Sequence, residues 1–141
     1  MARVVLLPID LSDTDTQKSA LAEALALLGS EGVLHVVSVL PDFGMAPVSG
    51  YFRKDFEKEA LAAFGRALTE WVETHVPDTV EVHPHVLHGT IYDEILRAAD
   101  KLEADVIVMG SHRPALKDYL LGPNAARVMR HARCSVYVVR A

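Results

Sequence analysis

The stretch Val4-Val5-Leu6-Leu7-Pro8-Ile9-Asp10 decides the fold class of this chain. It is a short, almost continuous run of apolar residues that ends in a proline and an aspartate. Such runs are typical of strands covered on both faces, as in a parallel sheet. Further runs rich in β-branched residues follow at Val33–Val39, Val80–Leu87, Val106–Met109 and Val136–Val139.

The segments between these runs have helical periodicity, because their apolar residues recur every three or four positions. Ser12 or Asp13 can cap the first helix, and Gly29 ends it. The expected helices run from about Asp13 to Leu28, from Lys54 to His75, from Ile91 to Leu102, and from near Pro123 onward. With right-handed crossovers, this alternation predicts a single α/β domain over residues 1–141. Its open parallel sheet of five strands has the expected order 3-2-1-4-5, with helices on both faces.

Composition narrows the class of protein. Half of the 141 residues are hydrophobic and 23% are charged, as in an ordinary globular domain. A net charge of −5 argues against nucleic acid as the main partner. The one cysteine, Cys134, excludes an internal disulfide and fits a reducing compartment. The first apolar run is too short for a secretory leader or a membrane span, so we expect a cytoplasmic protein without a membrane partner.

Two strand ends are candidates for a ligand site. In open α/β sheets, ligands bind beyond the carboxyl ends of the strands, where the strand order reverses. Asp10 follows the first strand and Gly110 follows the fourth, and these strands are neighbours in the expected order. The Asp10 carboxylate can accept hydrogen bonds from a ribose or an adenine amino group, or it can cap the helix that follows. Both roles stay open.

The segment from Gly110 to Asn124 is the second part of this candidate site. Gly110 lets a ligand approach the backbone, and Gly122 precedes a helix whose N–H groups and dipole favour an anion. His112 and Arg113 can contact phosphate oxygens, and Asn124 adds a short polar side chain. The segment contains neither a Walker loop nor the dinucleotide fingerprint. Glycines at these positions also occur in α/β proteins without ligands.

The whole chain resembles the universal stress protein family, and the C-terminal third is the most specific part. Residues 4–10 look like that family's first strand with its aspartate, and residues 34–37 look like its second. Residues 109–126 and 128–132 look like its signature loop and last helix, and residues 136–140 look like its terminal strand. The resemblance implies a Rossmann-like fold, similar to the adenine nucleotide alpha hydrolases, and a ligand such as ATP or AMP with Mg²⁺.

The resemblance also implies a role for each site residue. Asp10 would hold the ribose, while Pro8, Ile9 and Val36 would frame the adenine. The residues that would meet or flank the phosphates are Met109, Gly110, His112, Arg113, Gly122, Pro123 and Asn124.

The loop departs from the family's nucleotide-binding pattern G-x2-G-x9-G-(S/T). Arg113 replaces the second glycine, and eight residues separate it from Gly122. These two changes look like a sub-branch of small bacterial members with Ser-His-Arg-Pro in the loop. Pro123 stands where the family has serine or threonine, and it removes up to two donors. Their loss weakens phosphate binding by about tenfold to several hundredfold.

Three functions follow from this sequence. The main hypothesis is a stress-response module that binds an adenine nucleotide and acts through its dimer and its partners, without dedicated catalytic residues. The alternative is a dimeric stress protein that has lost nucleotide binding, as Pro123 suggests. Slow ATP hydrolysis is a third, with His112 orienting water. The resemblance implies a homodimer formed by antiparallel pairing of residues 135–140, an apolar edge strand that usually needs a cover.

Three other features have ordinary structural explanations beside functional ones. His83, His85 and His88 have spacing that can hold a metal, although solvated imidazoles on a partly exposed strand are commoner. Cys134 is interpreted as a small buried residue and not as a nucleophile. The irregular stretch from Pro41 to Phe52 is either a surface connection or a ligand lid.

Overall fold

The protein is an alternation of strands and helices, seen here in a computed structural model that describes residues 3–12, 14–40, 50–110 and 123–140. The elements are, in chain order, β1 (Val4–Pro8), α1 (Thr14–Leu28), β2 (Val33–Leu40), α2 (Gly50–His75), β3 (Glu81–His88), α3 (Ile91–Lys101), β4 (Val106–Gly110), α4 (Pro123–His131) and β5 (Ser135–Val139).

The five strands form one parallel sheet in the order β3-β2-β1-β4-β5, which confirms the expected fold class. β1 lies at the centre, and β3 and β5 form the two edges. The order reverses between β1 and β4, because the chain first builds outward to β3 and then crosses back to the other side of β1. This is the place where doubly wound sheets bind their ligands.

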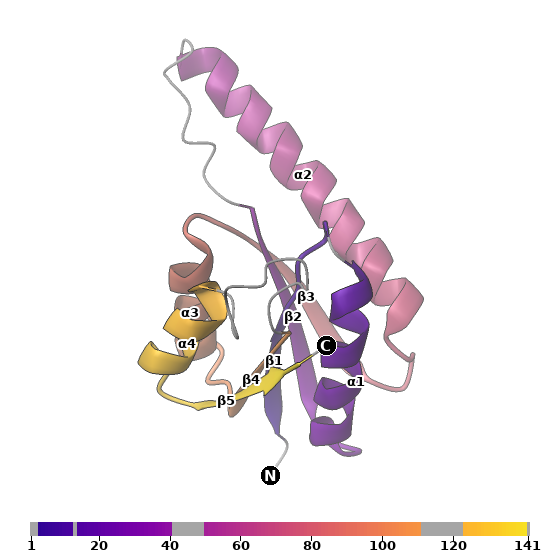
Figure 1. Ribbon diagram of the computed structural model, residues 1–141. Coiled ribbons are helices and arrows are strands. Elements are labelled where there is room, and N and C mark those ends of the chain that lie inside the picture. Colours follow the sequence, from indigo (N-terminus) through magenta and orange to yellow (C-terminus); the bar gives the residue numbers. More distant parts are fainter. Residues whose placement is uncertain (1–2, 13, 41–49, 111–122, 141) are drawn as a thin grey trace.

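Two helices cover each face of the sheet (Figure 1). Because successive side chains of a strand point to opposite faces, Leu7 packs toward α1 and α2 while Leu6 packs toward α3 and α4. Both leucines are fully buried, as expected for a central strand covered on both sides. Within the described residues, no helix is both long enough and apolar enough to cross a membrane.

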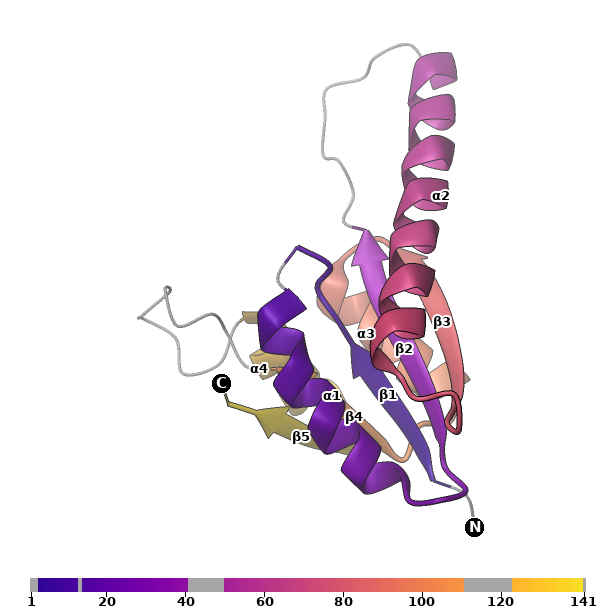
Figure 2. The same ribbon diagram turned by 90° about the vertical axis from the view of Figure 1, so that its right-hand side faces the viewer.

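The second helix differs from the expected one. α2 begins at Gly50, four residues before the predicted start at Lys54. The predicted start was too late because Gly50 and Tyr51 carry no apolar periodicity that marks a helix start. Its amino-terminal half extends beyond the sheet, whereas its other half packs on it (Figure 2). Leu68, Trp71 and Val72 anchor the packed half, and Val76, just after the helix, belongs to the same core. The stretch from Pro41 to Phe52, which was expected to be a surface connection or a ligand lid, ends within the first turn of α2. Its residues 41–49 lie outside the described part of the chain.

The other boundaries agree with the expected ones within a residue or two. Gly29 ends α1 with a φ of 66°, a left-handed conformation that glycine adopts without strain. β3 contains Pro84 in its interior, a position that a central strand would not tolerate for proline, because proline has no N–H for the ladder. Its position at the sheet edge explains why the strand persists through the proline.

Candidate functional site

The candidate site lies where β1 and β4 end side by side. Val5 pairs with Val106 and Leu6 with Ile107, and both strands run in the same direction. Asp10, just beyond β1, and Gly110, the last residue of β4, therefore emerge at the same edge of the sheet. α4 connects two parallel neighbouring strands, so it must run back along the sheet and begin near this edge.

The turn that carries Asp10 is held by β2. The Ile9 N–H donates to the Val37 carbonyl at 2.8 Å, which continues the ladder one residue past β1. The Ser38 hydroxyl then donates to the Ile9 carbonyl at 2.9 Å. Ser38 is only 2% exposed, so this hydrogen bond is shielded from water. Both backbone groups of Ile9 thus have a partner on β2, and the position of Asp10 is fixed by a buried contact.

The Asp10 carboxylate is exposed and oriented by the chain that follows it. Its Oδ1 atom accepts hydrogen bonds from the Ser12 N–H at 2.9 Å and the Ser12 hydroxyl at 2.6 Å. A short side chain that bonds the backbone two residues on is a common way to stabilise a turn. The carboxylate is therefore presented to solvent in a defined orientation just before α1.

The apolar candidates lie beneath this edge. Ile9 and Val36 belong to the core under α1 and α2, whereas Met109 belongs to the core under α3 and α4. Val36 is fully buried, Ile9 and Met109 are less than a tenth exposed, and Pro8 is buried as well. These side chains can support a ligand from below, while the polar contacts must come from residues nearer the surface.

The phosphate candidates are only partly described. Gly110 and Asn124 are half-buried, and Pro123 is exposed at the first position of α4. His112, Arg113 and Gly122 lie outside the described residues. The structure thus brings Asp10, Gly110 and the start of α4 to one edge of the sheet.

The sequence model described as "Universal stress protein family" matches residues 1–140 of this chain. The chain belongs to the universal stress protein family. It is similar to universal stress protein G of Shigella flexneri, with 34% identity over 144 residues that cover 99% of this chain and 100% of the relative.

Solved structures agree with the fold of this universal stress protein. The structure of the protein MJ0577 matches with a TM-score of 0.84 at 24% identity, and the match covers 100% of this chain and 97% of the other. A universal stress protein solved in complex with cAMP matches with a TM-score of 0.67 at 19% identity, covering 99% and 97% of the two chains. At such identities the likeness shows the Rossmann-like α/β fold.

In this universal stress protein, Pro123 is the first residue of α4, a helix position that suits proline. It offers no N–H to an anion. α4 is fixed against its neighbour α3 by Arg127, whose guanidinium lies 4.7 Å from the centre of the Tyr92 ring. The backbone N–H groups that follow Pro123 are thus presented by a helix that is anchored to the rest of the fold.

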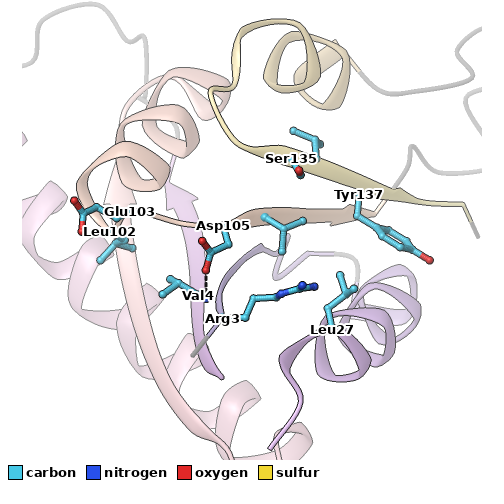
Figure 3. A pocket seen from close by; sticks show the side chains of 10 residues that line it. Arg3, Val4, Leu27, Leu102, Glu103, Asp105, Ser135 and Tyr137 are labelled. Carbon is cyan, nitrogen blue, oxygen red and sulfur yellow. Dashed lines mark hydrogen bonds between the residues drawn. The ribbon is translucent and has the colours of Figure 1, made fainter. Parts of the chain in front are cut away.

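A cavity of about 650 Å³ lies at the opposite edge of the sheet, at the amino ends of β1, β4 and β5 (Figure 3). Two of its polar side chains already have partners within the protein. The Asp105 carboxylate accepts the Val4 N–H at 2.7 Å, and the Tyr137 hydroxyl donates to Glu23 at 3.0 Å. This cavity lies at the amino edge of the sheet, whereas doubly wound folds bind ligands at the carboxyl edge, so the carboxyl edge stays the candidate site.

The histidines group differently from the spacing in the sequence. His83 and His85 share one face of β3, but alternation puts His88 on the other face. Their actual neighbour is His35 on β2, whose ring lies 5.3 Å from that of His83 and 5.1 Å from that of His85. Sequence reasoning missed His35 because the contact depends on strand register. Among the described residues, no group of three or more His, Cys, Asp or Glu is arranged to hold a metal.

Cys134 lies half-buried against the core beneath α3 and α4. Burial raises the pKa of its thiol, and the nearby carboxylates of Asp100 and Asp105 act in the same direction. A raised pKa keeps the thiol protonated and weakly nucleophilic. The side chain therefore acts as packing, as the sequence indicated.

Proposed function

We propose that this universal stress protein binds an adenine nucleotide, ATP or AMP with Mg²⁺, at the carboxyl edge of β1 and β4. In this proposal residues 1–141 form one domain that acts in the cytoplasm as a stress-response regulatory module through its dimer and its protein partners. The observation that carries the proposal is the Asp10 carboxylate, exposed and oriented beside the exit of β4.

The chemistry of that edge fits a nucleoside better than a small anion. A carboxylate repels phosphate but accepts hydrogen bonds from the hydroxyls of a ribose. The phosphates then belong at the other end of the site, at Gly110, Gly122 and the N–H groups of α4, where the helix dipole favours negative charge. His112 and Arg113 complete the proposed phosphate contacts. A relative solved with cAMP supports an adenine nucleotide as the ligand class.

Titration calorimetry with ATP and Mg²⁺ tests this proposal. We expect heat of binding from the wild type and an affinity lowered by about tenfold or more in Asp10→Asn, because a hydrogen bond to a charged group is lost. This variant keeps an oxygen that can accept from Ser12. Asp78→Asn, an exposed aspartate in the turn before β3, is the matched control and should bind like the wild type. No binding by the wild type at millimolar ATP would overturn the proposal.

Pro123 favours the second candidate function, a dimeric stress protein that binds no nucleotide. Proline at the start of α4 withholds one N–H and carries no hydroxyl. Pro123→Ser restores both donors, so we expect it to tighten ATP binding by about tenfold or more if the phosphates lie there. An unchanged affinity in a protein that binds ATP would place the phosphates away from this helix start.

The proposed homodimer uses the edge strand β5. Val136 and Val138 are half-buried, and the strand has β4 on one side only among the described residues. Antiparallel pairing with a second copy would cover this edge. Val138→Glu should convert the dimer to monomers in analytical ultracentrifugation, whereas Thr69→Glu on the exposed face of α2 should not. A wild-type protein that sediments as a monomer would exclude the dimer.

A further inference from the structure

Three imidazoles lie on one face of the strand pair β2–β3, and none of them belongs to the proposed nucleotide site. His35 pairs with His83 in the register of the two strands, and Val37 pairs with His85. The His35 and His83 rings are stacked, with planes 27° apart. The Nδ1 atom of His35 lies 2.9 Å from the Nε2 atom of His85, so one ring donates a hydrogen bond to the other.

The rings are arranged for a hydrogen bond and not for a metal ion. The centroids of His35 and His85 are 5.1 Å apart, which nearly equals the nitrogen–nitrogen distance of 2.9 Å plus the two ring radii. The two nitrogens therefore face each other head-on. A metal ion needs both lone pairs to converge on a third point, which would require the rings to turn.

The surroundings of His35 and His85 make protonation of these two rings unfavourable. On the central strand β1, the register neighbour of His35 is Leu6, which is fully buried and apolar. From α3 the cationic Lys101 acts on His85. On β3, Glu81 provides the opposing charge, since its Oε2 atom lies 2.9 Å from the Nε2 atom of His83.

We propose that His35, His83 and His85 form a proton-sensitive contact that holds the edge strand β3 on β2 and loosens when the His35 and His85 rings become charged. With neutral rings, the His35–His85 hydrogen bond ties two strands that are far apart in the sequence. Once both rings of this pair carry protons, neither nitrogen can accept, and like charges face each other across the strand pair. The contact lies on an edge strand, where fewer neighbours oppose its opening.

The direction of the pH effect follows from the pKa values of the two rings. Burial, and then repulsion by the neighbouring histidines, lowers the pKa of both His35 and His85 from 6.5. Glu81 partly offsets this for His35, and Lys101 adds to it for His85. The unfolded chain therefore takes up protons at a higher pH than the folded protein. The contribution of this contact to stability is complete well above pH 6.5 and is lost progressively as the pH falls below it.

Urea unfolding near pH 7.5 and near pH 5 tests the proposal. We expect the folding equilibrium constant of the wild type to fall severalfold more over this interval than that of His35→Gln, which cannot be protonated. His131→Gln, an exposed histidine of α4, is the matched control and should keep the wild-type pH dependence. Equal pH dependence in wild type and His35→Gln would overturn the proposal.

A second measurement uses the wild-type chain and does not depend on a variant that folds. Amide hydrogen exchange, corrected for the intrinsic effect of pH, should show β3 losing protection near pH 5 before β1 and β4 do. Imidazole NMR should give a lowered pKa for His35 that rises toward the ordinary value in His85→Gln. Uniform loss of protection across the sheet, or an unchanged His35 pKa in that variant, would refute the contact.

Discussion

Ser38 is the residue through which β2 fixes the proposed ligand edge. Its hydroxyl is buried and donates to the Ile9 carbonyl, one residue before Asp10. Removing the hydroxyl would leave this carbonyl buried with one partner fewer, and such losses destabilise a fold by about 1–3 kcal/mol. We therefore expect Ser38→Ala to lower the free energy of unfolding by about that amount in urea denaturation.

Thr74 provides a matched control for this prediction. Its hydroxyl also donates to a backbone carbonyl, that of Glu70, at 2.8 Å, but the pair is exposed. Water can replace this hydrogen bond, so Thr74→Ala should change stability by less than about 0.5 kcal/mol. Equal effects of the two substitutions would show that burial of the Ser38 contact is unimportant.

At the scale of elements, Gly29 just after α1 and Gly65 inside α2 have opposite effects on stability. Gly29 ends α1 with a positive φ, and an added Cβ would be strained there whatever space surrounds it. Gly65 lies inside α2, where its added Cβ would meet the Val86 side chain at 3.7 Å, an ordinary contact. Glycine in a helix interior is destabilising relative to alanine by about 0.5–1 kcal/mol.

We expect Gly65→Ala to raise the free energy of unfolding by about 0.5–1 kcal/mol and Gly29→Ala to lower it by about 1 kcal/mol. Thermal unfolding followed by circular dichroism measures both changes. Gly29→Asn should lose less stability than Gly29→Ala, because asparagine tolerates the left-handed conformation. A destabilised Gly65→Ala would mean that α2 and β3 approach more closely than the structure indicates.

At the scale of the whole molecule, one sheet joins two apolar cores. Ile107 is fully buried in the core beneath α3 and α4, whereas Trp71 lies in the core beneath α1 and α2. Trp71 is the one tryptophan of the chain, so its fluorescence reports on the face opposite Ile107. If both cores unfold together, damage to one must appear in the other.

Ile107→Ala tests this coupling. Truncation of a buried isoleucine destabilises by about 2–5 kcal/mol. We expect tryptophan fluorescence and circular dichroism to show the same reduced urea midpoint. Met129→Ala, at an exposed site on α4, should leave both midpoints nearly unchanged. Midpoints that separate in Ile107→Ala would show that the two faces unfold independently and would contradict the single domain.

Much of the architecture could be predicted from the sequence because local patterns carry it. Apolar runs such as Val4–Ile9 and Val106–Met109 predicted strands covered on both sides, and Gly29 predicted the end of α1. The meeting of Asp10 and Gly110 at one edge of the sheet was predictable too, since they follow strands that a doubly wound sheet places side by side. The start of α2 was predicted too late, because the apolar periodicity begins only after its first turn.

The sequence by itself determined the order of the elements, the parallel sheet and the family to which the chain belongs, because strand periodicity, helix periodicity and turn residues are local properties. Only the tertiary structure decided that Ser38 bonds the Ile9 carbonyl and that His35 joins His83 and His85. These partners lie 29 to 50 residues apart. The register between strands brings them together, and register depends on how the whole sheet packs between its helices.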